Sequence, residues 1–293
     1  MREPLREPSA AATARRESLP PLEAPVERVV APAKRRLKLR DIFGETSVIR
    51  VLATRDFKVK YKQSLLGPLW LVFQPLALLV AFVVAFRGLG DVKTSGVPYA
   101  VFSLVGLTVW AFFQASMTIG VSSLITNTSF IRYTPCPRPA FPLAAIIASL
   151  PSFAVTAAGA EISAAATGHL SPKVVLLPFG LAWLLLLTAG LVAIGASLAV
   201  RYRDMISALP FLLQVGVFFA PVGYSLAGLS PFMRKVVELN PLTGLIEAFR
   251  WMMLSGYSPN PGAIIAAVVE TTVLVVFAWV LFARLETTMA DEI

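Results

Sequence analysis

Six long uncharged stretches dominate the pattern of polar and apolar positions along the chain. A helix that crosses about 30 Å of hydrocarbon, rising about 1.5 Å per residue, needs about 20 apolar residues. Each stretch supplies one such helix, although the second ends in polar residues and the last contains Glu270. The pattern therefore predicts an all-α membrane protein with six spans near 68–87, 98–120, 141–160, 174–199, 206–228 and 262–283.

The basic residues indicate how these spans are oriented. Residues 1–62 hold 15 of the 26 Lys and Arg, and the loops on that side of the membrane hold most of the others. Cytoplasmic loops carry an excess of Lys and Arg, so both termini are predicted to be cytoplasmic. The net charge of +9 is accordingly interpreted as an orientation signal beside anionic lipid, and no nucleic-acid partner is expected.

Two segments precede the first span. Residues 1–40 are rich in Arg, Pro, Ala and Glu, lack the apolar region of a signal peptide, and are predicted to be a disordered extension. Residues 41–64 are predicted to form a helix in the cytoplasmic interface, followed by a membrane domain over 65–293. The interface helix has cations on much of its surface and a stripe of apolar side chains: Ile49, Leu52, Ala53, Phe57 and Tyr61. An ordinary basic flank of the first span would explain the charge but not the stripe.

The stretch YKQSLLGPLWLVFQPL, at 61–76, predicts a corner. Glycine permits a sharp bend and proline begins a helix well, so Leu66-Gly67-Pro68 can turn the chain from the membrane surface into the first span. Trp70 is then expected near the head groups. Gln74 follows one turn later, where a polar amide requires protein neighbours rather than lipid.

The segment 229–261, between the fifth and sixth spans, is apolar but broken by prolines. Pro231 opens one short helical pattern, Asn240-Pro241 ends it, and a second pattern follows in which Glu247 and Arg250 can pair on one face. This indicates a re-entrant helical hairpin on the outer side of the membrane. The alternative is an amphipathic helix on the outer surface.

Catalytic and metal-binding signatures are missing from the sequence. It has no GxxxxGK[ST] phosphate loop, no HExxH and no GxSxG. Cys136 and His169 are the only residues of their types, which excludes a zinc site of Cys and His ligands. Glu270 is the one acid inside a span, with Arg250 as a candidate partner, and is thin support for proton coupling.

Aromatic and amide side chains in the spans are candidates to line a transport path. Aromatic rings stack on the apolar faces of sugars while allowing them to slide. Most such rings face lipid, and the sequence does not tell which of them face inward. The candidates are Trp70, Phe73, Gln74, Phe82, Trp110, Phe113, Phe218, Phe219 and Tyr224.

Two long motifs resemble one transporter family. RDFKVKYKQSLLGPLWLVFQPL resembles the start of the first span in permeases of ABC transporters that export lipid-linked polysaccharides such as O-antigen, capsule and teichoic acid. NPLTGLIEAFRW, at 240–251, resembles the Asn-Pro-(Met/Leu)-Thr-Gly-Leu-Ile-Glu-x-Phe-Arg-Trp pattern before the last span of that family. The tail 289–293 is a partial match, and the resemblance covers about 41–293.

The resemblance implies a non-catalytic permease in the bacterial cytoplasmic (inner) membrane. It would form a homodimer with two separate ATPase subunits, which bind ATP and Mg²⁺, so that this chain itself binds no cofactor. Contacts with the ATPase are implied for Phe57, Tyr61, Leu66, Gly67, Arg132, Tyr133 and Arg138. An outer gate is implied for the hairpin residues Asn240, Pro241, Glu247, Arg250 and Trp251.

Three other functions remain open at this stage. A related exporter of drugs or small lipids would share the architecture but not need a continuous lined path. An ion-coupled secondary transporter would work without an ATPase. A membrane enzyme acting on a lipid-linked sugar lacks a visible catalytic cluster.

Overall fold

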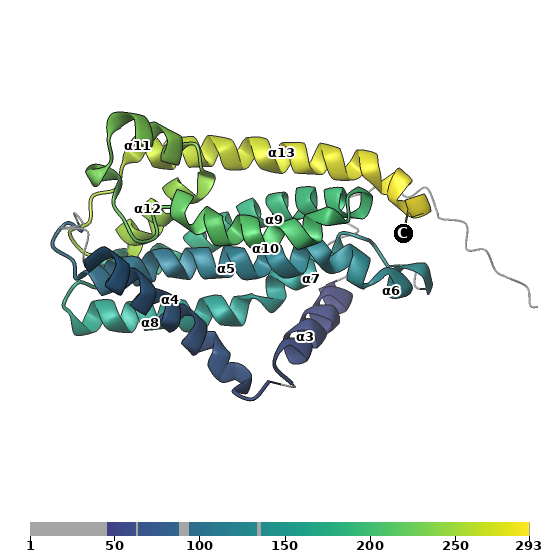
Figure 1. Cartoon of the computed structure of the whole chain (residues 1–293), viewed down its shortest axis with the longest axis horizontal. Coiled ribbons are helices and arrows are strands. Elements are labelled where there is room, and N and C mark those ends of the chain that lie inside the picture. The colour runs from purple at the N-terminus through teal and green to yellow at the C-terminus, as the bar shows by residue number, and fades with distance from the viewer. Residues whose placement is uncertain (1–45, 63, 88–93, 134–135, 293) are drawn as a thin grey trace, which may run out of the picture. The chain divides into compact units, whose positions relative to one another are not determined.

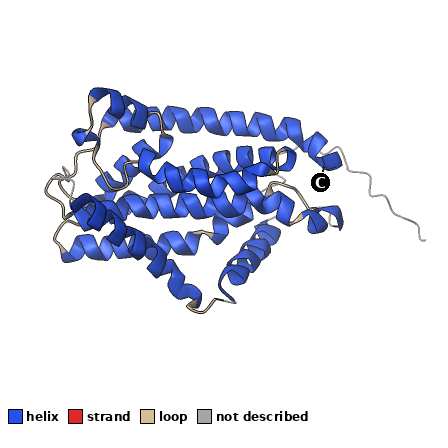
Figure 2. Ribbon diagram, viewed as in Figure 1, coloured by secondary structure: helices blue, strands red, loops and turns tan. Residues whose placement is uncertain are grey.

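Helices account for the regular secondary structure of the protein wherever it is described (Figure 2). The structure is a computed structural model that describes residues 46–62, 64–87, 94–133 and 136–292. These residues contain no sheet, only one isolated bridge between Leu170 and Leu254. The predicted all-helical class is confirmed for them, whereas the predicted extension 1–40 lies outside the described residues.

The predicted corner is present between two helices. Helix α3 covers Thr46–Lys62, the short 3-10 helix η1 covers Gly67–Leu69, and α4 covers Trp70–Arg87; Figure 1 shows α3 and α4 meeting at an angle. Gly67 has φ +51° with nothing within 4 Å of the position that a Cβ would take. Backbone conformation rather than space therefore requires glycine at this turn.

Helix α5, Tyr99–Thr126, is the most buried of the long helices. It begins where the second predicted span begins but runs six residues beyond the predicted end at 120. The hydroxyls of Thr118, Ser122 and Thr126 each donate to the helix carbonyl four residues earlier. These bonds let polar residues remain within the helix. A short helix, α6 (Thr128–Tyr133), follows.

The third predicted span is present but divided in two. Helix α7 covers Ala140–Ala148 and α8 covers Leu150–Ala166, with a break at Ser149. Pro151 lies just after the break and cannot donate the backbone bond that would continue α7. The 3-10 helix η2, Pro172–Leu176, and helix α9, Leu177–Arg201, then form the fourth predicted span.

The fifth predicted span, 206–228, is wrong in its second half. Helix α10 covers Asp204–Gly216, and the 3-10 helix η3, Val217–Phe219, extends it by one tight turn. Ala220 is extended, with φ −106° and ψ 138°. It precedes Pro221, and helical backbone angles are disfavoured for a residue before proline. Residues 220–225 are therefore irregular chain, followed by η4, Leu226–Gly228.

The predicted hairpin consists of α11, Pro231–Glu238, and α12, Pro241–Met253. Nearly every residue of α12 from Leu242 to Met253 is buried. Helix α12 is thus packed in protein on nearly all sides, and its re-entrant placement in the membrane stays a prediction. The last helix, α13 (Pro261–Glu292), packs along α9 and α12.

Five described segments are long and apolar enough to cross a membrane. They are Gly67–Ala85, Tyr99–Thr126, Ala140–Ala166, Pro172–Arg201 and Pro261–Arg284. The remaining predicted span corresponds to the shorter apolar segment Asp204–Phe219. The protein is therefore an all-helical, multi-pass membrane protein with about five candidate spans.

Candidate functional site

The guanidinium of Arg250 lies at the centre of the most buried polar cluster in the described structure. Arg250 is on α12 and is fully buried. Its Nη2 donates to the carbonyl oxygens of Pro221 and Val222, at 2.6 and 2.8 Å, and Nη1 makes a longer contact of 3.5 Å with the carbonyl of Tyr224. The ring of Phe102 lies 3.5 Å from the guanidinium carbon. Arg250 therefore satisfies the carbonyls that the broken chain after α10 leaves without helical partners.

Glu247 balances this charge from the same helix. Its carboxylate lies 3.6 Å from Nη1 of Arg250, as the spacing of three residues predicts. It also accepts from the Tyr257 hydroxyl at 2.7 Å and from the Asn260 backbone N–H at 3.1 Å. Burial raises the pKa of the Tyr257 phenol above its ordinary value, so the phenol stays protonated and remains a donor to Glu247.

Arg250 pairs with Glu247, and the proposed pairing with Glu270 is wrong. Glu270 is on α13, and its Oε2 is buried with no hydrogen-bond partner among the described residues. Nε of Arg250 is also without a partner in that part of the chain. The Arg250 cluster holds protein segments together and contains no arrangement for acid–base chemistry.

The other predicted hairpin residues also contact neighbouring segments. The Asn240 side chain accepts from the N–H of Leu242, which caps α12, and donates to the carbonyl of Phe219 at 3.1 Å. Pro241 is the first residue of α12. The Trp251 ring lies 4.4 Å from Nζ of Lys173. The hairpin is therefore fixed to the end of α10 on one side and to the α8–α9 connection on the other.

Helix α3 contacts the protein more extensively than its sequence suggests. Ile49, Leu52 and Ala53 are buried and pack in one cluster with Phe141 of α7. This half of the apolar stripe is therefore covered by α7. Phe57 and Tyr61 are only partly buried, and their rings lie 5.0 Å apart.

A tie that the sequence reading missed links α3 to the end of α5. Nη2 of Arg55 donates to Oδ1 of Asn127 at 2.7 Å, and Asn127 is the residue between α5 and α6. The interface helix and the loop after the second span are therefore adjacent. An asparagine at a helix end was the available signal, since it caps or bridges helix termini.

The remaining residues expected to contact an ATPase lie close to this tie in the sequence. Leu66 and Gly67 are half-buried at the corner. Arg132 and Tyr133 belong to α6, but their side chains lie outside the described ones, and Arg138 is half-buried before α7. An ATPase contact for these residues stays a prediction.

The candidates for the transport path separate into two groups. Phe82, Trp110 and Phe113 are buried in the core. The side chains of Trp70, Phe73 and Gln74 on α4 are exposed, as are Phe218 and Phe219 on η3, while Tyr224 is half-buried. The rings of Phe82 and Phe218 lie 6.5 Å apart, so α4 and η3 are neighbours. The exposed candidates lie on these two neighbouring elements and are together named here the α4–η3 face.

These observations describe a helical, multi-pass membrane protein whose hairpin is fixed by a buried charged cluster. The family model of the ABC-2 type transporter matches residues 47–254, from α3 to the end of the hairpin. The chain belongs to the ABC-2 type transporter family. As a permease of that family it is a non-catalytic membrane subunit, and ABC-2 permeases pair with ATPase subunits.

Curated relatives agree with this assignment. The chain is 23% identical over 258 residues to the O-antigen export system permease protein RfbA of Myxococcus xanthus, covering 87% of this chain and 98% of that protein. It is 25% identical over 216 residues to the protein of the same name from Klebsiella pneumoniae, covering 70% of this chain and 80% of the relative.

Proposed function

We propose that this chain is the permease of an exporter that moves a lipid-linked polysaccharide, of the O-antigen or teichoic-acid kind, out across the bacterial cytoplasmic membrane. Separate ATPase subunits, with ATP and Mg²⁺ bound to them, drive the movement, and this chain binds no cofactor. The observation that carries the proposal is the similarity to an O-antigen export permease along nearly its whole length.

The α4–η3 face supports a path for a sugar chain. Exposed aromatic rings lie beside the exposed amide of Gln74, and Gln214 on α10 is exposed as well. Amides are costly in contact with hydrocarbon, whereas sugars offer hydroxyls to amides and apolar faces to rings. We place this face toward a second copy of the chain, with the path between the two copies.

The proposed topology retains six crossings. The segment Asp204–Phe219 makes the fifth crossing together with the irregular chain 220–225, whose carbonyls Arg250 satisfies. Irregular backbone at membrane depth is tolerated where protein surrounds it. Both termini, α3 and α6 then lie on the cytoplasmic side, and the hairpin lies on the outer side as a gate.

Deletion of the gene in its host tests the cargo. Cells without the chain should keep the completed lipid-linked polysaccharide on the inner face of the membrane and lose it from the surface, and the wild-type chain should restore it. Unchanged surface polysaccharide, or loss of a small lipid or drug export activity instead, would contradict the proposal.

The energy source is tested separately. Purified chain alone should not hydrolyse ATP, and its complex with the cognate ATPase should. ATP hydrolysis by the chain alone would refute the two-component arrangement. Export that survives loss of the ATPase would point to ion coupling.

A further inference from the structure

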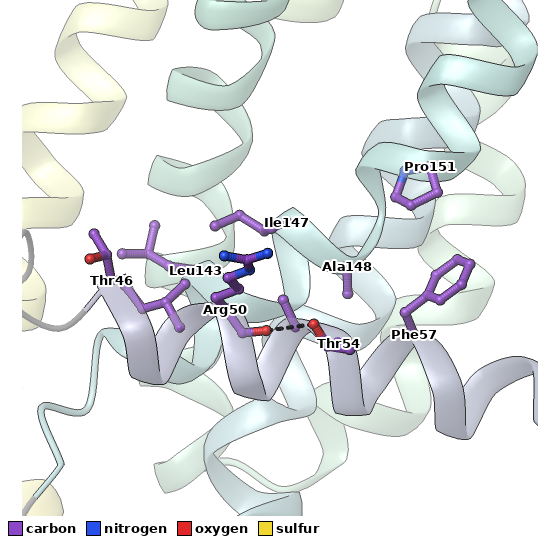
Figure 3. Close-up of a pocket in the computed structure, with 10 residues that line it drawn as sticks. Thr46, Arg50, Thr54, Phe57, Leu143, Ile147, Ala148 and Pro151 are labelled. Carbon is purple, nitrogen blue, oxygen red and sulfur yellow. Dashed lines mark hydrogen bonds between the residues drawn. The ribbon is translucent and has the colours of Figure 1, made fainter.

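An apolar groove lies between one face of α3 and the α7–α8 segment, beside the contact between α3 and α7 (Figure 3). Its volume is about 470 Å³, within the roughly 300–1,000 Å³ of small-molecule sites. One wall is Leu143, Ile147, Ala148 and Pro151, and the other is one face of α3. The break between α7 and α8 falls between two residues of the first wall, Ala148 and Pro151.

The charged group in the groove is Arg50. Figure 3 shows its side chain extending from α3 toward Ile147. The neighbouring Thr54 hydroxyl donates to the Arg50 backbone carbonyl at 2.8 Å, and the Arg50 side chain is exposed. No carboxylate in the described part of the chain pairs with that guanidinium.

The apolar wall determines the environment of this cation. It belongs to Ala140–Ala166, a segment apolar enough to cross a membrane, and Ile147 is 41% exposed. This wall is therefore apolar enough to lie against acyl chains. A guanidinium beside hydrocarbon requires an anion, and phosphate accepts two parallel N–H bonds from arginine.

We infer that the groove binds one anionic phospholipid of the surrounding leaflet. Its phosphate contacts Arg50, and an acyl chain lies along Ile147 and Pro151 as far as Phe57. Further cations on α3, Lys58, Lys60 and Lys62, are exposed and raise the local concentration of anionic lipid. The bound lipid fills the space beside the α3–α7 contact and holds α3 at a fixed distance from α8.

Photolabelling of the assembled exporter tests this site. The full chain with its ATPase is placed in phosphatidylcholine vesicles containing about a tenth of phosphatidylglycerol with a photoactivatable acyl chain. Labelled peptides are then mapped by mass spectrometry. The label should concentrate on 143–151 and on α3. Arg50→Gln should lower it about tenfold or more, because a hydrogen bond to a charged group is lost, whereas Lys58→Gln removes one cation near the surface and should lower it by about fivefold at most.

A second variant separates the acyl chain from the phosphate. Ile147→Trp fills the groove while Arg50 is kept, and it should also remove the label. Both changed side chains are exposed, so the assembled complex should elute normally in gel filtration.

Three results would overturn the inference. One is equal labelling of Arg50→Gln and Lys58→Gln, which would indicate attraction to the surface alone. Another is label that persists in Ile147→Trp. The third is displacement by a polyprenyl phosphate at lower concentration than by phosphatidylglycerol, which would assign the groove to a carrier lipid. The labelling does not depend on which polysaccharide is exported, so its outcome is independent of the proposed cargo.

Discussion

Arg250 shows how one side chain stabilises a break in a membrane segment. A lysine offers a single nitrogen, whereas the guanidinium presents a rigid fork that contacts several acceptors. Here the fork reaches three carbonyls within 221–224 and the carboxylate of Glu247. Removal of the guanidinium would leave these carbonyls and the carboxylate without their cationic partner.

The first prediction concerns this cation. Arg250→Met should lower the free energy of unfolding by about 3–5 kcal/mol, because it leaves Glu247 as an uncompensated buried charge. Arg250→Lys keeps the charge but not the fork, so it should lower the free energy of unfolding by a smaller amount. Lys235→Met, at an exposed site on α11, serves as the matched control and should change little. Thermal denaturation of the purified protein measures the difference, and an Arg250→Met protein as stable as the control would refute the role.

A second residue-scale prediction concerns the helix behind the cluster. A Cβ at Gly106 of α5 would lie 2.8 Å from the carbonyl oxygen of Val222 and 3.2 Å from Nη2 of Arg250. Gly106→Ala should therefore destabilise the protein by about 1–3 kcal/mol. Gly159→Ala is the control, since nothing lies within 4 Å of its Cβ position, and alanine should be neutral or stabilising there. Equal melting temperatures for both variants would contradict the close approach.

At the scale of elements, the corner between α3 and α4 depends on the backbone of Gly67. Asparagine adopts positive φ more readily than other residues with a Cβ, and β-branched residues do so worst. Gly67→Asn should keep most of the export, whereas Gly67→Val, at a cost of about 1–3 kcal/mol of local strain, should lose most of it. Surface polysaccharide is measured at equal protein level in the membrane. Equal export by both variants would show that the corner is not needed.

The tie between α3 and the α5–α6 junction gives another prediction. The Arg55 side chain is 42% exposed, so Asn127→Ala should cost less than about 1 kcal/mol of stability. It should instead weaken the link between ATP hydrolysis and export in the assembled complex. Asn127→Asp keeps the acceptor and should restore the link. If Asn127→Ala exports normally per ATP hydrolysed, the tie plays no part in coupling.

Helix starts were predictable from the sequence because prolines and polar flanks mark them, as at 98, 231 and 241. The end of α10 was missed, since irregular chain can be as apolar as helix. Pro221 was nevertheless a local signal for it. The pairing of Glu247 and Arg250 followed from their spacing. The carbonyl partners of Arg250 did not, because 26 to 29 residues separate them from it in the chain.

At the scale of the whole molecule, the residues of the α4–η3 face stay exposed in the single chain, while the candidate Tyr224 is half-buried. Family membership could be predicted from two motifs because they are long. The side chains that face a path could not, since hydropathy alone does not separate buried rings such as Phe113 from exposed ones such as Phe218.

The last prediction tests that face. Gln74→Leu should leave folding intact, because the side chain is exposed, yet reduce export by removing a hydrogen-bonding group from the path. Gln74→Asn keeps the amide and should export close to the wild-type level. Surface polysaccharide and melting temperature are measured together. Full export by Gln74→Leu would exclude Gln74 from the path.

The chain order of the Arg250 contacts has a consequence for synthesis. Phe102, the carbonyls within 221–224 and Glu247 all precede Arg250, so they have left the ribosome before the cation does. The nascent chain can neutralise Arg250 as soon as it emerges, before α13 has left the ribosome. Glu247 receives Tyr257 and Asn260 only 10 and 13 residues after itself. The hairpin can thus be completed by the time α13 begins to insert.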